Sequence, residues 1–399
     1  MKILAISWAS HTEVNRQIFR VLNAQDGLEV AVVIPRSINI DGVAVSCDDY
    51  SNEDIEITAL DITNDNPRYN RYIGIHSVIK KIKPDIVYHE DDPVSVQAVQ
   101  YGFMCYFYNS KLICRTNQNT NISYADEIKR LGFIKGALYA WLKLSMFWVA
   151  QHFISHIFSI SNDGTSIFKN LGFKSVTKIP LGLDEETFNI DETARKSIRL
   201  KFGVDHIIFG YFGRAIEGKG LHLFLEALST LKKYNWSILL DNSIRKKNDE
   251  YLQKINNLIK QWQLEERVIF FEADHREIAD YMNAADIVAV PSITTPSFKE
   301  QYGRVAPEAM ACGCLVIASN SGTLPELVKG AGWVFGEGNV SELAVLLKEA
   351  LEIKNLPSLG VISSEYSRKY LGVNAQAKKM MNVFNIYSNR SNPFIVKDR

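Results

Sequence analysis

Cysteine is scarce in this chain, and its few residues carry no pairing signature. Five cysteines occur among 399 residues, an odd number with no Cys-x-x-Cys pair. Disulfide scaffolds and cysteine-ligated zinc sites are both recognised by such regular spacings. We therefore expect reduced, mostly buried thiols, as in a cytoplasmic protein, with Cys312 and Cys314 acting as packing residues.

An excess of charge of either sign is also absent. Lysine plus arginine and aspartate plus glutamate each total 45, so the formal net charge is zero. A neutral chain has no overall field that would favour binding to nucleic acid. Apolar residues make up 46% and charged residues 23%, which is ordinary for a globular protein, and the length is enough for two domains.

Two phosphate-binding motifs are missing as well. No Gly-x-Gly-x-x-Gly follows the first predicted strand, and the chain has no Walker-type Gly-Lys-Ser/Thr. Internal repeats and low-complexity segments are absent too. Residues 1–7 are too short an apolar stretch for a signal peptide and predict a strand instead.

Strand-like and helix-like segments alternate along the chain, which favours parallel sheets covered by helices on both faces. A stretch rich in Pro, Gly and acidic residues at 180–192 separates two such series. We predict an α/β protein with two Rossmann-like, doubly wound domains facing a central cleft. The first domain is 1–185, onto which a C-terminal helix at 366–388 crosses back, and the second is 186–365. Strands are expected at 1–7, 29–34, 85–88, 111–115, 157–160, 207–213, 237–240, 267–271, 286–290 and 315–318. Helices are expected at 12–25, 71–83, 93–104, 163–171, 218–232, 247–263, 339–353 and 364–388.

Two carboxylates flank a predicted strand-to-helix turn in the second domain. Glu300 lies in the loop after the strand, and Glu308 lies in the first turns of a helix that begins near Arg304. Open α/β sheets bind ligands at the carboxyl ends of their strands. The pair is suited to accept hydrogen bonds from sugar or ribose hydroxyls. The alternative is that both residues merely compensate the helix dipole.

A cationic, glycine-rich loop follows another predicted strand. The apolar run 207–213 leads into Arg214 and Lys219, directly before a helix that starts at Leu221. A cation at a helix start is mildly unfavourable, and an anion docked between these groups would remove that cost. The alternative is a solvated loop in which Lys219 pairs with Glu217.

Together these segments resemble the C-terminal domain of retaining GT-B glycosyltransferases of family four. The motifs that carry the resemblance are Gly213-Arg214 with Lys219-Gly220, Glu300 and Glu308 with the run to Gly313, and the stretch from Ser321 to Glu326. The stretch 179–184 is similar to the family's Pro-Asn-Gly-Val-Asp linker signature, although Leu181 replaces the usual Asn. The first loop, 7–12, lacks the Gly-Gly pair of many members, which leaves phosphate contacts from the N-terminal domain open.

The resemblance implies transfer of a hexose from a nucleotide diphosphate sugar with retention of configuration, without a metal or other cofactor. Arg214 and Lys219 would stabilise the departing diphosphate, Glu300 would orient the donor sugar, and Glu308 would bind the ribose. The expected donors are UDP-sugars or GDP-sugars, and the expected acceptor is a saccharide or a lipid-linked molecule in surface polysaccharide or glycoconjugate synthesis. The further donor-binding candidates are Gly213, Ala273, Asp274, Pro291, Ser292, Gly303, Arg304 and Val305, and the base is expected beside His275.

Acidic residues follow the predicted strand 85–88 of the first domain. They could line the acceptor side, or cap a helix that starts at Pro93. A third reading is a divalent-ion site of the Asp-x-Asp kind found in GT-A transferases. The acceptor-side candidates are His11, Glu90, Asp91, Asp92 and Asn117.

The most apolar stretch is 133–160, but Lys143, Gln151 and two histidines interrupt it, so a membrane span is not expected. It predicts either a core helix leading into a strand near Ile157 or a helix whose aromatic face rests on a membrane. Between residues 111 and 178, nine Lys and Arg stand against three Asp and Glu. This local excess suits an anionic surface, such as the inner face of the cytoplasmic membrane, or a lipid-diphosphate acceptor.

Two other functions are compatible with the same fold. A nucleotide-sugar 2-epimerase would need acid and base side chains around a single donor. A non-catalytic nucleotide-sugar-binding partner would bind the donor without releasing nucleotide diphosphate.

Overall fold

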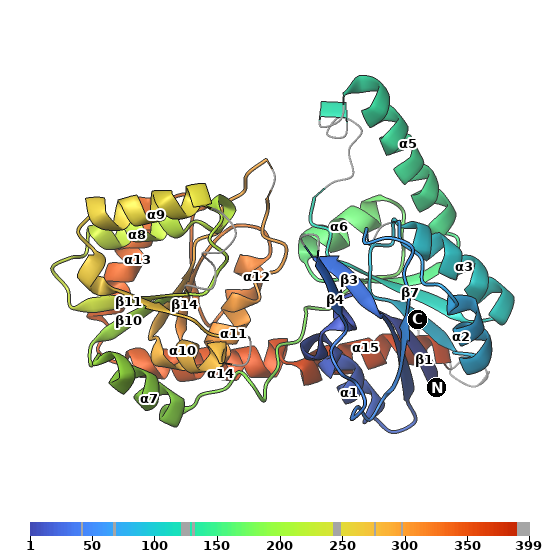
Figure 1. Cartoon of the computed structure of the whole chain (residues 1–399), viewed down its shortest axis with the longest axis horizontal. Coiled ribbons are helices and arrows are strands. Elements are labelled where there is room, and N and C mark those ends of the chain that lie inside the picture. The colour runs from blue at the N-terminus through green and yellow to red at the C-terminus, as the bar shows by residue number, and fades with distance from the viewer. Residues whose placement is uncertain are drawn as a thin grey trace, which may run out of the picture. The chain divides into compact units, whose positions relative to one another are not determined.

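The chain forms two compact α/β units in a computed structural model (Figure 1). The described residues are 1–40, 43–66, 69–120, 128–129, 132–241, 249–274, 277–296 and 298–388. Unit 1 comprises Met1–Pro180 and the chain from Val373 onwards, and unit 2 comprises Leu181–Gly372. Each unit contains one parallel sheet, so the predicted α/β class with two Rossmann-like units is confirmed. The structure divides the chain at 180/181 and 372/373, compared with predicted boundaries at 185/186 and 365/366.

Unit 1 has a seven-stranded sheet in the order β5-β2-β1-β6-β7-β8-β9, and every recorded pairing in it is parallel. Its strands are β1 (Lys2–Ile6), β2 (Glu29–Pro35), β5 (Glu56–Leu60), β6 (Ile86–His89), β7 (Lys111–Thr116), β8 (Ile154–Ser159) and β9 (Val176–Lys178). A separate antiparallel hairpin joins β3 (Ser37–Ile40) to β4 (Val43–Ser46). The helices are α1 (Gln17–Asn23), α2 (Ile75–Ile82), α3 (Val96–Tyr108), α5 (Phe133–Ala150), α6 (Asn162–Asn170) and α15 (Val373–Ser388).

Both faces of this sheet are buried, because alternate residues of each strand point to opposite sides. On β1, Leu4 and Ile6 belong to a core shared with α2, α3 and α6. Ile3 and Ala5 belong to the opposite core, which α1 and α15 complete. The C-terminal helix is therefore an integral part of unit 1.

Unit 2 has a six-stranded parallel sheet in the order β12-β11-β10-β13-β14-β15. Its strands are β10 (Ile207–Tyr211), β11 (Trp236–Asp241), β12 (Val268–Phe271), β13 (Ile287–Val290), β14 (Leu315–Ser319) and β15 (Trp333–Phe335). Its helices are α7 (Glu192–Phe202), α8 (Leu221–Ser229), α9 (Asp249–Gln261), α10 (Ile278–Ala284), α11 (Val305–Ala311), α12 (Leu324–Val328), α13 (Val340–Glu352) and α14 (Leu356–Leu371). Apolar side chains of α8, α9 and α13 cover one face of the sheet.

The strand order of unit 2 reverses at β10. Successive strands run outward from β10 through β11 to β12 on one side, and from β13 to β15 on the other. The loops that leave β10 and β13 therefore start side by side at the carboxyl edge of the sheet. Ligands of open α/β sheets bind at this kind of switch point.

The predicted helix 364–388 is wrong as a single element. The structure has α14, which starts earlier, and α15, with Gly372 between them. A Cβ atom on Gly372 would lie 2.6 Å from the main-chain carbonyl oxygen of Arg368. This close approach requires glycine, and the apolar periodicity of the sequence runs through it without a break.

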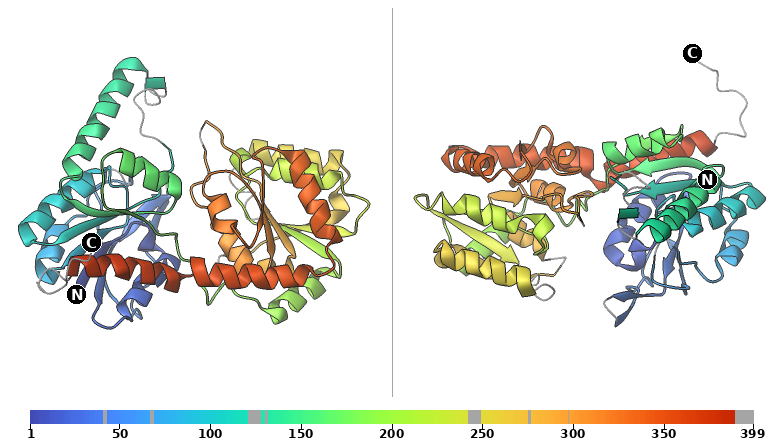
Figure 2. Two further views of the ribbon diagram at one scale, coloured as in Figure 1. Left: turned by 180° about the vertical axis from the view of Figure 1, so that it is seen from behind. Right: turned by 90° about the horizontal axis from the view of Figure 1, so that it is seen from above.

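The apolar stretch 133–160 separates into α5 and β8. Gly136, Ala140 and Phe147 lie on the buried face of α5, so the helix packs on unit 1 along one side. Figures 1 and 2 show α5 extending beyond the rest of unit 1, with its N-terminal end outermost. Within the described residues, no helix is both long enough and apolar enough to cross a membrane.

Candidate functional site

Lys219 and Glu300 meet at the switch point of unit 2, although 80 residues separate them in the chain. The Lys219 ammonium donates to Oε2 of Glu300 at 2.6 Å, and both side chains are largely buried. The hydroxyl of Ser292, at the end of β13, donates to the same carboxylate oxygen at 2.7 Å. The proposed alternative partner, Glu217, instead lies 3.8 Å from Lys254. The pairing of Lys219 with Glu217 is therefore wrong.

Glycines bring the two loops of this site into direct backbone contact. Gly220 has a φ of +70°, and a Cβ atom there would lie 1.9 Å from the carbonyl oxygen of Pro291. One turn away, the N–H of Ile293 donates to the carbonyl of Gly218 at 2.8 Å. The loop after β10 is therefore fixed against the loop after β13, and it positions Lys219.

The backbone of Glu300 is held as closely as its side chain. Gly322, in the turn after β14, has a φ of +55°, and a Cβ atom there would lie 1.9 Å from the Glu300 carbonyl oxygen. Gly303, another donor-side candidate, has a φ of +80°, and a Cβ atom there would lie 2.5 Å from Leu324. Three loops from one sheet edge thus converge on this glutamate.

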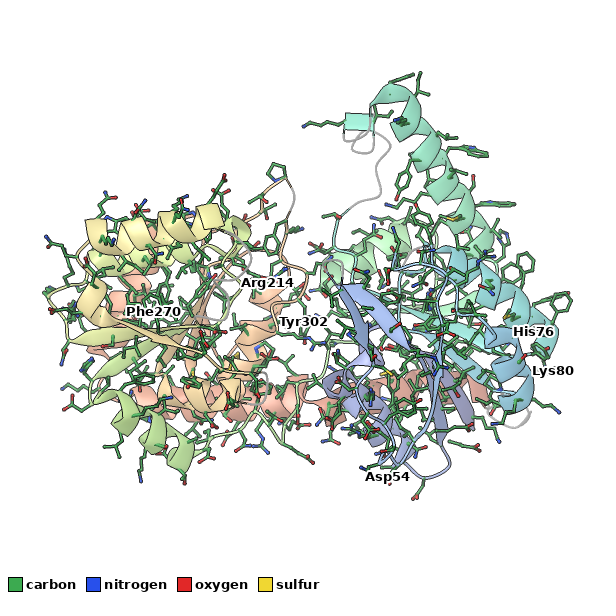
Figure 3. The ribbon with its side chains drawn as sticks, in the orientation of Figure 1. Asp54, His76, Lys80, Arg214, Phe270 and Tyr302 are labelled. Atoms are coloured by element: carbon green, nitrogen blue, oxygen red, sulfur yellow. The ribbon has the colours of Figure 1, made fainter. Side chains whose placement is uncertain are left out.

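Arg214 differs from Lys219 in its surroundings. It is exposed and follows Gly213 at the end of β10, and Figure 3 labels it. Its carbonyl accepts hydrogen bonds from the N–H of Ile216 at 2.9 Å and from the hydroxyl of Tyr211 at 3.1 Å. Its guanidinium forms no ion pair with the described part of the chain, so its charge is available to an anion.

Glu308 lies on α11, where Arg304 is the N-cap residue and Val305 begins the helix. Burial raises the pKa of the Glu308 carboxyl to about 7, and the nearby charge of Arg304 acts in the opposite direction. A carboxyl with this pKa changes its charge near neutral pH. Hydroxyl groups that donate to it would favour its ionised form.

The candidates for contact with the base follow β12, which is the edge strand on the far side of β11. Asp274 is exposed, and its Oδ1 accepts from the N–H of Glu277 at 2.9 Å. The N–H of Asp274 in turn donates to Oε2 of Glu277 at 3.1 Å. This reciprocal pair precedes α10, with Ala273 partly buried beside it. His275 lies outside the described residues.

In unit 1, Glu90 follows β6 and is buried in a polar network. The Ser7 hydroxyl donates to one carboxylate oxygen, and the Arg115 guanidinium donates to the other at 2.6 Å. The Arg115 side chain, from β7, is itself mostly buried. Both oxygens of Glu90 therefore have partners within the protein.

Asp91 and Asp92 come next in the chain and do not cap a helix. Asp92 accepts from the N–H of Val94 at 2.9 Å, while α3 is capped by the hydroxyl of Ser95, which accepts from the N–H of Ala98 at 3.0 Å. The helix therefore starts later than Pro93, and the capping alternative for the acidic residues is wrong. Burial raises the pKa of the Asp91 carboxyl to about 7, although Arg115 opposes the shift.

The two remaining acceptor-side candidates lie in separate loops of unit 1. His11 is partly buried at the end of a short 3-10 turn, with Nδ1 3.2 Å from the carbonyl oxygen of Trp8. Asn117 is exposed just after β7. Among the described residues, no cluster of three or more His, Cys, Asp or Glu side chains could hold a metal ion.

The segment that carries Lys219, Glu300 and Glu308 has known relatives. Residues 193–367 match the family model described as "Glycosyl transferases group 1". Residues 193–367 are thus similar to a group 1 glycosyl transferase domain. This domain coincides with most of unit 2.

Curated relatives align with only part of the chain. A D-inositol 3-phosphate glycosyltransferase of Xylanimonas cellulosilytica is 32% identical over 157 residues, which cover 38% of this chain and 36% of that protein. The capsular polysaccharide biosynthesis glycosyltransferase CapM of Staphylococcus aureus is 25% identical over 47% of this chain and 46% of its own length. The first three curated relatives are matched over 36%, 48% and 38% of their lengths.

Solved structures show that the fold extends over both units. HepE of Anabaena, crystallised in complex with UDP, matches with a TM-score of 0.68, covering 97% of this chain and all of that one. The sequences are 18% identical, so this likeness concerns the fold alone. Together with the parallel sheets of both units, it establishes the GT-B fold for this chain.

Sequence reasoning missed several residues that shape the site. The Lys219 ammonium lies 5.3 Å from the centre of the Phe298 ring, which also packs against Gly218. The Tyr211 hydroxyl supports the loop by donating to the carbonyl of Lys219 at 3.3 Å. The Ser319 hydroxyl donates to the main-chain carbonyl of Ser292, just after β13, at 2.5 Å. Tyr211 is the last residue of the apolar strand β10. Its hydroxyl group is the only feature of the sequence there that could have indicated this contact with the loop.

Proposed function

We propose that this protein is a retaining hexosyltransferase that uses a nucleotide diphosphate sugar, with the donor bound at the switch point of unit 2. The observation that carries the proposal is the cluster of Lys219, Glu300 and Ser292, held by three loops at one sheet edge. Its position within the group 1 glycosyl transferase match supports the assignment. Arg214, exposed beside it, supplies a second cation.

The proposed chemistry breaks the bond between the anomeric carbon and the diphosphate oxygen, and forms a new bond from that carbon to an acceptor hydroxyl. Arg214 and Lys219 would stabilise the negative charge that develops on the leaving diphosphate, which accepts the proton of the acceptor. Fixed cations in a preorganised site are typically the largest catalytic term in such reactions. Neither Glu300 nor Glu308 is assigned as a nucleophile.

The two glutamates have different proposed tasks. Glu300 would orient the donor sugar through its hydroxyls, since its position is fixed by Lys219 and Ser292. Glu308 would accept hydrogen bonds from the ribose, for which its ionised form is the better acceptor. The remaining donor contacts would come from Gly213, Ala273, Asp274, Pro291, Gly303, Arg304 and Val305.

Uridine diphosphate is the first choice of donor nucleotide, with guanosine diphosphate second. The HepE structures, which contain UDP and UDP-glucose, support this order. We also propose that transfer needs no metal ion. EDTA should then leave turnover unchanged, and strict dependence on Mg²⁺ or Mn²⁺ would contradict this part of the proposal.

The acceptor is proposed to be a saccharide or a lipid-linked molecule in surface polysaccharide or glycoconjugate synthesis. The name of the CapM relative supports a polysaccharide pathway. On unit 1, Asp91 is the favoured acceptor contact, because both oxygens of Glu90 are already engaged by the protein. We also propose that the protein associates peripherally with the inner face of the cytoplasmic membrane.

A thermal-shift series with uridine, guanosine and adenosine diphosphates tests donor binding, because a bound ligand raises Tm by mass action. We expect the largest shift with UDP. No shift with any of the three would contradict the proposed donor site.

Replacement of Arg214 tests the catalytic role. Because the residue is exposed, Arg214→Ala should keep the wild-type Tm while its rate of nucleotide-sugar turnover falls by about 10²–10³-fold. Exposed Arg36, paired with Asp61 in unit 1, offers a matched control as Arg36→Ala. Slow release of UDP by the wild type excludes a purely binding protein, whereas near-normal turnover of Arg214→Ala would overturn the assignment.

A further inference from the structure

The outer face of α5 is more apolar than its buried face, which is the reverse of an ordinary surface helix. The outward residues are spaced by four, three and seven positions, which places them on one side of the helix: Ile134, Leu138, Trp141 and Trp148. Their exposed fractions are 81%, 57%, 57% and 64% in that order. The buried residues are Gly136, Ala140, Lys143, Phe147 and Ala150.

The exposed apolar surface continues onto α3. Phe103, Tyr106 and Phe107 are exposed there, and the helix packs beside α5. The ring of Phe153, which follows α5, lies 4.7 Å from that of Phe103 and 6.4 Å from that of Tyr106. We define the α3–α5 surface as the exposed apolar side chains Phe103, Tyr106, Phe107, Phe133, Ile134, Leu138, Trp141, Leu142 and Trp148. A contiguous surface of this kind marks an interaction site in a protein.

The charged residues within α3 and α5 have one sign. Neither α3 nor α5 contains an Asp or Glu, and Lys135 of α5 is exposed. Beside α3, Nε2 of His76 on α2 lies 2.9 Å from the hydroxyl of Tyr108 at the end of α3. Lys80 is exposed one turn further along α2. Figure 3 labels both α2 residues at the outer edge of unit 1. In the described part of the chain, Lys80 and Lys135 form no ion pairs.

We propose that the α3–α5 surface docks on an anionic lipid bilayer, with α5 lying in the interface. Trp and Tyr are the residues that favour the boundary between headgroups and acyl chains, and lysines at the rim would meet anionic headgroups. A second copy of this chain is a poorer occupant, because a symmetric contact would place the cationic rims of two copies together. The α3–α5 surface belongs to unit 1, and its docking would bring the protein to the membrane that holds the proposed acceptor. In this respect the inference rests on the proposed function.

Co-sedimentation with vesicles tests the inference on the full chain, without any nucleotide sugar. Vesicles of phosphatidylcholine mixed with phosphatidylglycerol should retain the wild type, and those of phosphatidylcholine alone should retain less. The triple variant Ile134→Ser, Leu138→Ser, Trp141→Ser should lose at least about tenfold in binding. Lys80→Glu with Lys135→Glu should lose binding to the anionic vesicles selectively.

Leu200→Ser on α7 is the matched control, since Leu200 is 83% exposed and lies in unit 2. It should bind vesicles as the wild type does, and all variants should keep the wild-type Tm because only exposed side chains change. Absence of wild-type binding to both kinds of vesicle would overturn the inference. So would lipid-free dimerisation of the wild type that the triple variant abolishes, which would assign the surface to a second copy. UDP thermal shifts of the same samples report separately on the donor site.

Discussion

At the scale of single residues, Glu300 is fixed simultaneously through its carboxylate and its carbonyl. Lys219 and Ser292 hold the carboxylate, and Gly322 approaches the carbonyl with no room for a side chain. The sequence places Glu300 in a loop after a strand, but it cannot show which cation is nearest. Glu217 is two positions from Lys219 in the chain, yet the structure pairs the lysine with a residue from another loop.

Gly322→Ala should disturb this arrangement strongly. The substitution adds a Cβ atom 1.9 Å from the Glu300 carbonyl oxygen at a φ of +55°. We expect a loss on the order of 3 kcal/mol in the free energy of unfolding, together with weaker UDP-sugar turnover. Chemical denaturation and a turnover assay measure the two effects.

Gly203→Ala is the matched control for this substitution. Gly203 also lies in unit 2, with a φ of +65°, but nothing would lie within 4 Å of an added Cβ atom. Only backbone strain of about 1–2 kcal/mol is expected, with no effect on turnover of the folded enzyme. Equal losses of stability in the two variants would show that the contact with Glu300 is unimportant.

Glu308 should make stability depend on pH. Its carboxyl has a pKa of about 7 in the folded protein against 4.5 as its ordinary value, so the folded state binds the proton more tightly. The contribution is therefore favourable below pH 4.5 and is lost as the pH rises towards 7. The loss is at most about 3 kcal/mol, reduced by the partial exposure of the residue.

Glu308→Gln should remove that slope. Denaturation of both proteins between pH 4.5 and 8 measures it, and the stability difference between them should change in favour of the variant as the pH rises. A constant difference over the whole range would contradict the raised pKa.

At the scale of elements, α14 is held by small residues that allow close approach. Its serine hydroxyls at 364 and 367 donate to the carbonyls of Ala311 and Pro307 on α11, each at 2.7 Å. A Cβ atom on Gly360 would lie 2.0 Å from the carbonyl oxygen of Gly313. These contacts fix the end of α11, the helix that carries Glu308.

Gly360→Ala should therefore destabilise the protein, although alanine is the better helix former. The intrinsic gain of about 0.5–1 kcal/mol is smaller than an overpacking cost of about 2 kcal/mol. Val361→Ala, at an exposed position of the same helix, should change the unfolding free energy by less than about 0.5 kcal/mol. A higher Tm for Gly360→Ala than for the wild type would contradict the close packing of α14 against Gly313.

The elements that the sequence predicted well are those with uniform burial. β6 and β13 are buried throughout, and short apolar runs identify them. β15 was missed because it has three residues, of which Val334 is exposed. The α3–α5 surface escaped a definite prediction for a related reason: apolar periodicity identifies a helix but not the side on which its partner lies.

At the scale of the whole molecule, donor binding should be visible in one unit only. We expect UDP to slow amide hydrogen exchange in the loops 213–220 and 291–304 of the full chain, since ligand binding suppresses local opening. Exchange in β5 and α1 of unit 1 serves as the internal reference. Protection confined to unit 1 would place the nucleotide elsewhere.

The path of the chain has a consequence for synthesis. Val373, Ala377 and Phe384 of α15 pack with Phe19, near the beginning of the sequence, in one core of unit 1. Unit 2 is thus an insertion, and the ribosome must complete it before that core can close. A nascent or truncated product that stops before α15 would leave Phe19 and its neighbours exposed. We therefore expect chaperones to bind the first half of the chain in such a product.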